Sequence, residues 1–350
     1  TTQGRPQTEG NLNSRRNIQA AWRALVTPRY KLAVDNRENV RLLIDLEKDR
    51  YEMQNLANQP EHAALQKRLW KQLKSIGQQT RDPFPNPVAR APAKPVAKAP
   101  GPASSASRVS QIVAHRGAAT ERPENTLAAL RRAIEVGATA TEVDVRTSQD
   151  GKLFLLHDAT LDRTTNGNGT ATELTLAKLK QLDAGSWFDR KYREERIPAL
   201  SEALILCRGK IDVLLDLKEQ GEAYAKQVAG EVQKFGDPKK TIVGVRSVEQ
   251  AKLFRRLLPE ARQLGLIPDP QAIPSFSQAG VEMIRLWPRW LEDKTLVPQV
   301  KKAGVKLHLN GTTGVSEEVL QLLPYQPDSI SSDDPGELIR TLQRIGSSKQ

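Results

Sequence analysis

From Gln111 onward, short runs of aliphatic and β-branched residues alternate with stretches of helical period, and this alternation most constrains the fold. No G-x-G-x-x-G follows the first run, which argues against a dinucleotide-binding sheet. Roughly eight strand–helix units in about 240 residues favour an α/β fold, a closed (β/α)8 barrel, over an open doubly wound sheet. The predicted strands are residues 112–115, 141–145, 153–157, 211–217, 241–245, 263–267, 281–286, 305–309 and 328–332. The predicted helices are residues 125–136, 200–206, 222–235, 248–258, 295–303 and 316–323.

The positive charge of the chain is concentrated before this alternating region. A net charge of +12 over 350 residues first suggests nucleic acid, an anionic membrane or a phosphorylated ligand as the partner. Residues 1–108 contain 19 Lys or Arg and 9 Asp or Glu, whereas residues 109–350 contain 34 and 32. Residues 84–108 are rich in Pro, Ala and Lys, so we expect an extended linker there. We therefore predict three parts, 1–83, 84–108 and 109–350, of which the last is nearly neutral.

Residues 1–83 predict a small α+β segment. Residues 23–34 are interpreted as one strand that pairs with residues 41–46 around a turn at 36–39. Residues 60–76 have the apolar spacing of an amphipathic helix that ends before Gly77. The segment resembles the C-terminal part of the sulfatase family in T-P-R-Y-K-L, L-I-D-L-E-K-D and N-L-A. Because the Cys-x-Pro-x-Arg motif of that family does not occur in this sequence, the resemblance implies a sulfatase-like segment without its catalytic core.

Polar side chains gather at the ends of the first four predicted strands of the barrel region. Residues two apart in a strand point to the same side, so Glu142 and Asp144 form one pair, and Asp216 and Lys218 form another. Active sites of closed barrels lie at the carboxyl ends of the strands. One such side chain is more often structural, but seven of them at four successive strand ends indicate one site. The seven are His115, Arg116, Glu142, Asp144, His157, Asp216 and Lys218.

This set of side chains suits the cleavage of a phosphodiester. Three carboxylates without a thiolate favour a hard divalent cation, Ca²⁺ or Mg²⁺, over zinc. An arginine and a lysine beside that cation suit a phosphate group. Two histidines can share acid–base catalysis, one taking a proton from the nucleophile and the other protonating the leaving alkoxide.

The barrel region contains a series of short motifs around these polar residues. They are A-H-R-G at 114–117, P-E-N-T at 123–126, E-V-D-V at 142–145, D-G at 150–151, H-D at 157–158, L-D-R-T-T-N-G at 161–167, D-A-G-S-W-F at 183–188, I-P-A-L at 197–200 and S-D-D-P at 332–335. With these motifs, residues 111–340 resemble the glycerophosphodiester phosphodiesterase family almost from end to end. The resemblance implies a TIM-type barrel with a small insertion after the third strand, residues 160–196, which forms one wall over the active-site mouth. It also implies hydrolysis of a glycerophosphodiester to glycerol 3-phosphate and an alcohol, by attack of the neighbouring glycerol hydroxyl and opening of a cyclic intermediate by water.

The same resemblance assigns roles to the residues of the set. His115 and His157 would be the acid–base pair, and Arg116 would contact the phosphate. Glu142 and Asp144 would be metal ligands.

The chain departs from the family pattern at two places. The family's third metal ligand is a Glu two residues before a Lys, whereas here Asp216 precedes Lys218, with Glu219 as a weaker substitute. The shorter Asp216 implies a water-bridged metal or a different cation preference. The family's W-T-x-N segment is L-H-L-N at residues 307–310, so the aromatic wall of the substrate pocket is in question, and His308 is interpreted as structural more readily than as a pocket residue.

Two other classes of function stay open. A related phospholipase D-like barrel or phosphodiester lyase would act on lysophospholipid or sphingomyelin. A non-catalytic protein would hold an anion or nucleic acid, but the nearly neutral barrel and the lack of aromatics clustered with Lys and Arg argue against nucleic acid. We therefore expect a small glycerophosphodiester as the partner, with no nucleic acid and no stable membrane insertion.

The location of the protein is predicted from weaker signals. The chain begins with Thr1 rather than Met, so a signal peptide could have preceded it. The single cysteine, Cys207, excludes an internal disulfide. We expect a periplasmic or secreted location rather than a cytoplasmic one.

Overall fold

The computed structural model describes residues 22–35, 40–47, 55–79, 106 and 108–347. The chain divides into two compact units, Thr1–Val96 and Ala97–Gln350, each of which is described by itself. Most of the predicted linker and the predicted turn at residues 36–39 lie outside the described residues.

The first unit is a three-stranded antiparallel sheet with one helix against it. Strands β1 (Trp22–Val26), β2 (Tyr30–Asp35) and β3 (Val40–Asp45) pair in chain order. The predicted single strand at 23–34 is therefore wrong, because a tight turn in which the Thr27 and Tyr30 backbones hydrogen-bond at 2.8 Å separates β1 from β2. A 3₁₀ turn, η1 (Pro60–His62), leads into α1 (Ala63–Gln79), which extends past its predicted end.

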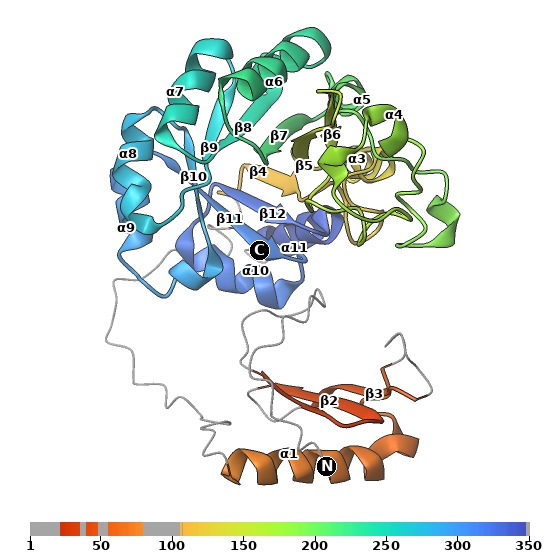
Figure 1. Cartoon of the computed structure of the whole chain (residues 1–350). Helices are drawn as coiled ribbons and strands as arrows, with labels where there is room; N and C mark the ends of the chain where they lie inside the picture. The colour runs from red at the N-terminus through yellow and green to blue at the C-terminus, as the bar shows by residue number, and fades with distance from the viewer. Residues whose placement is uncertain (1–21, 36–39, 48–54, 80–105, 107, 348–350) are drawn as a thin grey trace. The chain divides into compact units, whose positions relative to one another are not determined.

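Eight parallel strands of the second unit close into a barrel, as the alternation predicts (Figure 1). The ring closes because β4 pairs with both its sequence neighbour β5 and the last strand β12. The barrel strands, in their order around the ring, are β4 (Gln111–Ala114), β5 (Ala140–Thr147), β7 (Asp212–Leu217), β8 (Thr241–Val245), β9 (Arg262–Gly265), β10 (Met283–Leu286), β11 (Lys306–Thr312) and β12 (Ser329–Ser332).

The third predicted strand is not part of the barrel. Strand β6 (Leu153–Leu155) pairs antiparallel with the end of β5, with Val145 opposite Leu155. The short connection from β5 to β6 leaves room only for a hairpin, which returns the chain beside β5 rather than across the barrel. The insertion thus follows the third strand in chain order, but it lies between the second and third strands of the barrel.

Helices surround the barrel and cover its outer face (Figure 1). All six predicted helices are present within one or two residues of their predicted bounds, and α8 and α11 are additional. Branched side chains that alternate along the strands pack outward against these helices, as Val143 and Leu215 do. The helices are α3 (Leu127–Glu135), α5 (Leu200–Cys207), α6 (Glu222–Phe235), α7 (Val248–Leu257), α8 (Ile273–Gln278), α9 (Leu296–Lys302), α10 (Ser316–Leu322) and α11 (Pro335–Ser347).

A second, smaller core fills the inside of the barrel. Val113, Ala140, Leu214, Ile242 and Leu264 belong to this cluster of buried residues. Inward-facing residues further along the same strands are polar, as Glu142 and Asp216 are. The apolar cluster therefore closes the amino end of the barrel and leaves the carboxyl end for the polar residues.

The insertion at residues 160–196 has an apolar core of its own. Phe154 from β6 packs with Leu161, Leu179 and Ile197, all of which are buried. The only α-helix in the insertion is short, α4 (Leu176–Leu179), so this small core holds the segment in place. None of the helices that the structure describes is long and apolar enough to cross a bilayer.

Candidate active site

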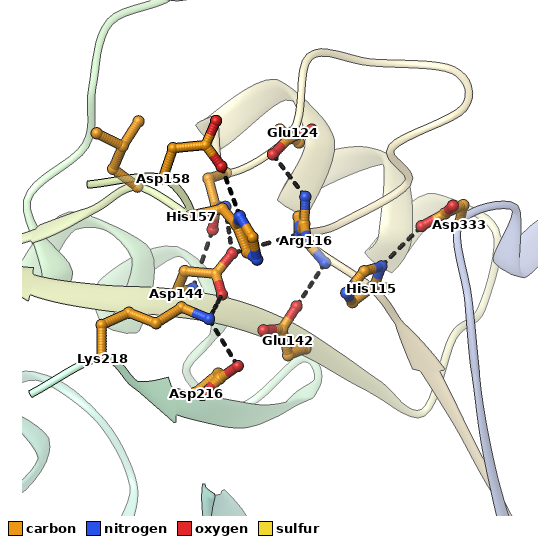
Figure 2. A network of polar contacts seen from close by, with 12 residues as sticks. His115, Arg116, Glu124, Glu142, Asp144, His157, Asp158, Asp216, Lys218 and Asp333 are labelled. Carbon is orange, nitrogen blue, oxygen red and sulfur yellow. Dashed lines mark hydrogen bonds and ion pairs between the residues drawn. The ribbon is translucent and has the colours of Figure 1, made fainter. Parts of the chain in front are cut away.

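The seven residues predicted from the sequence come together at the barrel mouth (Figure 2). His115 and Arg116 directly follow β4, and Lys218 directly follows β7. Glu142 and Asp144 lie in the middle of β5 rather than at its end, because the hairpin with β6 lengthens this strand beyond the barrel.

Three carboxylates converge in the centre of the site. Asp144 on β5 and Asp216 on β7 are direct neighbours across the parallel pair. One carboxylate oxygen from each of Glu142, Asp144 and Asp216 lies within 4.8 Å of the others. Glu219 is not in this group, since its Oε1 accepts a hydrogen bond of 2.7 Å from the Thr147 amide. Asp216, despite its shorter side chain, is therefore placed where a third ligand is needed.

Burial and mutual repulsion set the protonation of these acids. Burial, together with the charges of Asp144 and Asp216, raises the pKa of Glu142 to about 8. Burial alone would raise the pKa of Asp144 as well, but the positive charges of Lys218 and Arg116 outweigh it and hold that pKa far below its usual range. Lys218 Nζ lies 2.7 Å from Asp144 Oδ1 and 2.8 Å from Asp216 Oδ2. Three carboxylates whose oxygens lie within 4.8 Å of one another repel each other, and a divalent cation would relieve this repulsion.

The turn after β4 directs backbone as well as side-chain donors into the site. Arg116 has a left-handed backbone, with φ 57°, and its amide donates a hydrogen bond of 2.7 Å to Glu142 Oε2. Gly117 follows with φ 81° and packs so closely on Ala129 that a Cβ would lie 2.6 Å from the Ala129 Cβ. A left-handed non-glycine residue is energetically unfavourable, and such residues concentrate at functional sites.

His115 is held by an aspartate from the far end of the chain. Its Nδ1 lies 2.7 Å from Asp333 Oδ1, across a sequence separation of 218 residues. Burial lowers the pKa of His115, but the hydrogen bond to Asp333 and the charge of Glu142 more than offset this, so the net pKa is raised. The imidazolium form of His115 is therefore stabilised.

His157 is held by the residue that follows it. Its Nδ1 lies 2.7 Å from Asp158 Oδ1, and its backbone carbonyl accepts a hydrogen bond of 2.7 Å from Arg146 on β5. Burial and the charge of Arg116 lower its pKa, against the opposing charge of Asp144. The neutral imidazole is therefore favoured, in contrast to His115. Although His157 follows β6 and not a barrel strand, the hairpin brings it over the mouth (Figure 2).

A network of ion pairs connects the two sides of the site. The side chain of Glu124 is 2% exposed and accepts hydrogen bonds from Arg116 at 2.9 Å and from Arg163 at 2.8 Å. Arg163 in turn donates at 2.5 Å to Asp158, the partner of His157. The insertion thus contributes Arg163 to a chain of contacts that runs from His157 to Arg116.

Four of these supporting residues have no role that the sequence predicts. Glu124, Asp158, Arg163 and Asp333 all lie in segments that carry the family resemblance. A carboxylate directly after a histidine, as in Asp158, was the one local signal available. The pairing of Asp333 with His115 has no local signal, because it depends on the closure of β12 onto β4.

Asn125 and Arg246 are two further residues that touch the carboxylates. Asn125 Nδ2 donates at 2.7 Å to Asp144 Oδ2, and Asn125 Oδ1 accepts from the Asp144 amide at 3.0 Å. The Arg246 guanidinium, directly after β8, is bonded to Asp216 Oδ1. Asp216 is consequently held between Arg246 and Lys218, so its orientation is fixed from both sides.

A pocket inside the mouth extends from His115, Glu142 and Asp216 toward β10 and β11. His308 and Asn310 on β11 face this pocket, whereas Leu307 is buried on the opposite side, against the helices. Leucine in place of the family's tryptophan therefore changes the packing behind the strand rather than the pocket wall. Burial lowers the pKa of His308 to about 3, and its two ring nitrogens bond to Ser329 and Ser331, so it is a neutral structural residue, as expected.

Comparison with known proteins gives a consistent family assignment. The family model described as glycerophosphoryl diester phosphodiesterase family matches residues 115–337. A glycerophosphodiester phosphodiesterase of Caldanaerobacter subterraneus is 31% identical over 242 residues, which are 67% of this chain and 98% of that protein.

Solved structures agree with this assignment. A glycerophosphodiester phosphodiesterase from Agrobacterium tumefaciens has 30% identity and a TM-score of 0.57, and the match covers 66% of this chain and 99% of that chain. A phosphodiesterase from Oleispira antarctica, in complex with the product sn-glycerol-3-phosphate, has 27% identity and a TM-score of 0.62. That match covers 68% of this chain and 99% of the other.

Proposed function

Because the chain belongs to the glycerophosphoryl diester phosphodiesterase family, we propose that its barrel hydrolyses glycerophosphodiesters to glycerol 3-phosphate and an alcohol. The observation that carries this function is that two histidines, one with a raised and one with a lowered pKa, lie beside three clustered carboxylates at the mouth of the barrel. A solved relative binds glycerol 3-phosphate as its product. The reaction therefore has a small molecule as its substrate.

Glu142, Asp144 and Asp216 fit a divalent metal ion. All three offer carboxylate oxygens, their ligand atoms cluster within 4.8 Å, and burial together with the neighbouring carboxylates raises the pKa of Glu142. An oxygen-only set of this kind suits Ca²⁺ or Mg²⁺. When bound, such an ion neutralises charge that develops on the phosphate oxygens.

The two histidines divide the proton transfers according to their surroundings. His157 favours its neutral form, so it accepts the proton of the glycerol hydroxyl that attacks phosphorus. His115 favours its charged form, so it donates a proton to the alkoxide that leaves as the P–O bond breaks. Arg116 and Lys218 compensate the charge of the phosphate.

A second step with reversed roles completes the hydrolysis. His115, now neutral, takes a proton from water, whose oxygen attacks the cyclic phosphate. His157 returns its proton to the glycerol oxygen as the ring opens. Both histidines end in their starting state, and the product is glycerol 3-phosphate.

The test is to measure release of glycerol 3-phosphate from glycerophosphocholine and related diesters. We expect release that stops with EDTA and returns when Mg²⁺ or Ca²⁺ is added alone, because the carboxylate cluster needs a cation. Accumulation of a cyclic phosphate without glycerol 3-phosphate would identify a lyase instead. Turnover of lysophospholipid or sphingomyelin in preference to glycerophosphodiesters would identify a phospholipase.

For the first unit we propose a sulfatase-like segment that lacks a catalytic core. The support is the T-P-R-Y-K-L, L-I-D-L-E-K-D and N-L-A segments, together with a small antiparallel sheet that packs on one helix. We expect no hydrolysis of a chromogenic aryl sulfate by this chain. Measurable, saturable sulfate release would contradict the proposal.

We also propose a periplasmic or secreted location and no nucleic-acid partner. Residues 109–350 are nearly balanced in charge, with 34 Lys or Arg and 32 Asp or Glu, and the excess of positive charge lies in residues 1–108. Fractionation of cells that express the complete gene tests the location. A DNA mobility-shift assay at two salt concentrations tests nucleic-acid binding, and a salt-dependent shift would contradict the proposal.

A further inference from the structure

Arg285 is a cation in the active-site pocket without an anionic partner. It lies on β10, in register with His308 on β11, and lines the same pocket as His115 and Glu142. Within the part of the chain that the structure describes, its guanidinium has no hydrogen bond or ion pair, and its Nε is buried. The guanidinium lies over the ring of Trp287, with Cζ 4.1 Å from the ring centroid.

The other cations around the mouth differ from Arg285 because they form hydrogen bonds or ion pairs. Four of them contact carboxylates: Arg116 contacts Glu124, Arg163 contacts Asp158 and Glu124, Lys218 contacts Asp144 and Asp216, and Arg246 contacts Asp216. Arg146 donates instead to the backbone carbonyls of Leu156 and His157. A charge that is partly removed from water and lacks an anionic partner is unfavourable for folding. Burial accordingly lowers the pKa of Arg285 to about 10, although the charge of Asp216 opposes this. A bound anion would compensate this unpaired charge.

The position of Arg285 separates it from the phosphate that is cleaved. Strand β10 lies four strands from β5 in either direction around the ring, so Arg285 is opposite Glu142 and Asp144. The cationic groups that serve the reacting phosphate, Arg116 and Lys218, are beside those carboxylates. Since Glu142 and Arg285 line one pocket, a ligand held at the carboxylates extends across the mouth to Arg285.

We propose that Arg285 forms a second anion subsite, which binds a carboxylate or phosphate group on the alcohol half of the substrate. The glycerol half of a glycerophosphodiester has only hydroxyl groups, so a second negative charge belongs to the alcohol. The planar guanidinium presents paired donors that match a carboxylate or phosphate, and Trp287 orients its plane. This inference rests on the proposed function and specifies its substrate class.

Two matched pairs of substrates test the subsite. Glycerophosphoserine differs from glycerophosphoethanolamine by one carboxylate, and glycerophosphoinositol 4-phosphate differs from glycerophosphoinositol by one phosphate. We expect the wild-type chain to have the higher kcat/KM for the anionic member of at least one pair. Arg285→Gln should lower kcat/KM for that member about 10- to 100-fold, mainly through KM, and leave kcat/KM for the counterpart without the additional anionic group nearly unchanged.

Two further variants separate charge, geometry and folding. Arg285→Lys keeps the charge but not the planar fork, so it should recover part of the preference. Arg289→Gln is the matched control, because Arg289 stacks on Trp287 and Trp290 but is not among the residues that line the pocket. Arg289→Gln should leave the ratio of kcat/KM between the two members of each pair as it is in the wild type. The thermal unfolding temperature should be the same for all variants.

The outcomes distinguish this inference from the proposed function. If glycerol 3-phosphate is released but Arg285→Gln lowers both members of each pair equally, the subsite is wrong and the proposed function stands. If none of the four compounds is hydrolysed, the proposed function fails, and calorimetric titration of the same compounds tests binding directly. In that titration, affinity for the anionic members that does not depend on Arg285 overturns the subsite.

Discussion

Each of the two histidines at the mouth has an aspartate at Nδ1, yet the two pairs have different electrostatic surroundings. His115 contacts Asp333 and is close to the negative Glu142, which favours the imidazolium. His157 contacts Asp158, but Arg163 neutralises that aspartate and lowers its pKa to about 2. An acid and a base therefore arise from the same pair of side-chain types. The difference comes from burial and the charge of Arg116, which lower the pKa of His157, whereas Asp333 and Glu142 raise the pKa of His115.

Removal of one imidazole should stop turnover without unfolding the protein. We expect His115→Ala to lower kcat by about 10²- to 10⁴-fold, the usual contribution of a general acid or base. His115 is partly exposed at the mouth and contributes no apolar packing to the barrel. Release of glycerol 3-phosphate measures the loss, and circular dichroism with thermal unfolding measures the fold. A variant that folds normally and stays active would rule out this role for His115.

The aspartate partners should shift opposite limbs of the pH profile of kcat/KM. His115 acts in its protonated form, so activity falls as the pH rises through its pKa. Asp333→Asn removes the negative acceptor, lowers that pKa and moves the alkaline limb to lower pH. His157 acts in its neutral form, so Asp158→Asn lowers its pKa and moves the acid limb to lower pH instead. An alkaline limb that stays in place in Asp333→Asn would contradict the assignment of His115 as the acid.

At the scale of elements, the turn after β4 both packs on the barrel unit and places residues of the site. It supplies His115, aims the Arg116 amide at Glu142, and packs Gly117 against α3. The hairpin of β5 and β6 has a similar effect on the other side, because it carries His157 back over the mouth. Two short irregular connections, rather than the regular strand–helix repeats, thus place both histidines.

Gly117 should be intolerant of even one added methyl group. Gly117→Ala puts a side chain on a left-handed backbone and also places its Cβ 2.6–2.7 Å from atoms of Ala129. We therefore expect a loss of roughly 2–5 kcal/mol in the free energy of unfolding. Gly137→Ala is the matched control, since Gly137 also has φ 81° but meets nothing within 4 Å. Gly137→Ala should lower the free energy of unfolding by only about 1–2 kcal/mol. Urea unfolding followed by circular dichroism measures both, and equal losses would show that the close packing has no effect.

At the scale of the molecule, charge and catalysis belong to different parts of the chain. Most of the net charge of +12 comes from residues 1–108, whereas the residues of the site lie between His115 and Asp333. The proposed cationic contacts of the substrate, Arg116, Lys218 and Arg285, all lie in the barrel unit. The total charge is consequently a poor guide to the partner of this protein.

A chain that begins at Ala97 should therefore keep the activity and lose the basic character. This start retains Ala106, which packs in the core of the barrel unit. We expect unchanged kcat/KM for glycerophosphodiesters and earlier elution from a cation-exchange column at neutral pH. A large fall in kcat/KM in a shortened chain that unfolds at the same temperature would show that residues 1–96 take part in catalysis.

The sequence by itself determined the barrel, most of its helices and the seven polar residues that meet in the site. It could do so because periodicity is a local property, and because residues two apart on a strand, such as Glu142 and Asp144, share a side in any sheet. Only the tertiary structure decided that β6 pairs back on β5 outside the barrel, that Asp333 meets His115, and that Arg285 lies unpaired opposite the carboxylates. The positions of Asp333 and Arg285 depend on residues that are far apart in the chain, and they follow from how the sheet closes. The pairing of β6 with β5 is short-range, but an apolar run alone does not tell a barrel strand from a hairpin strand outside the barrel.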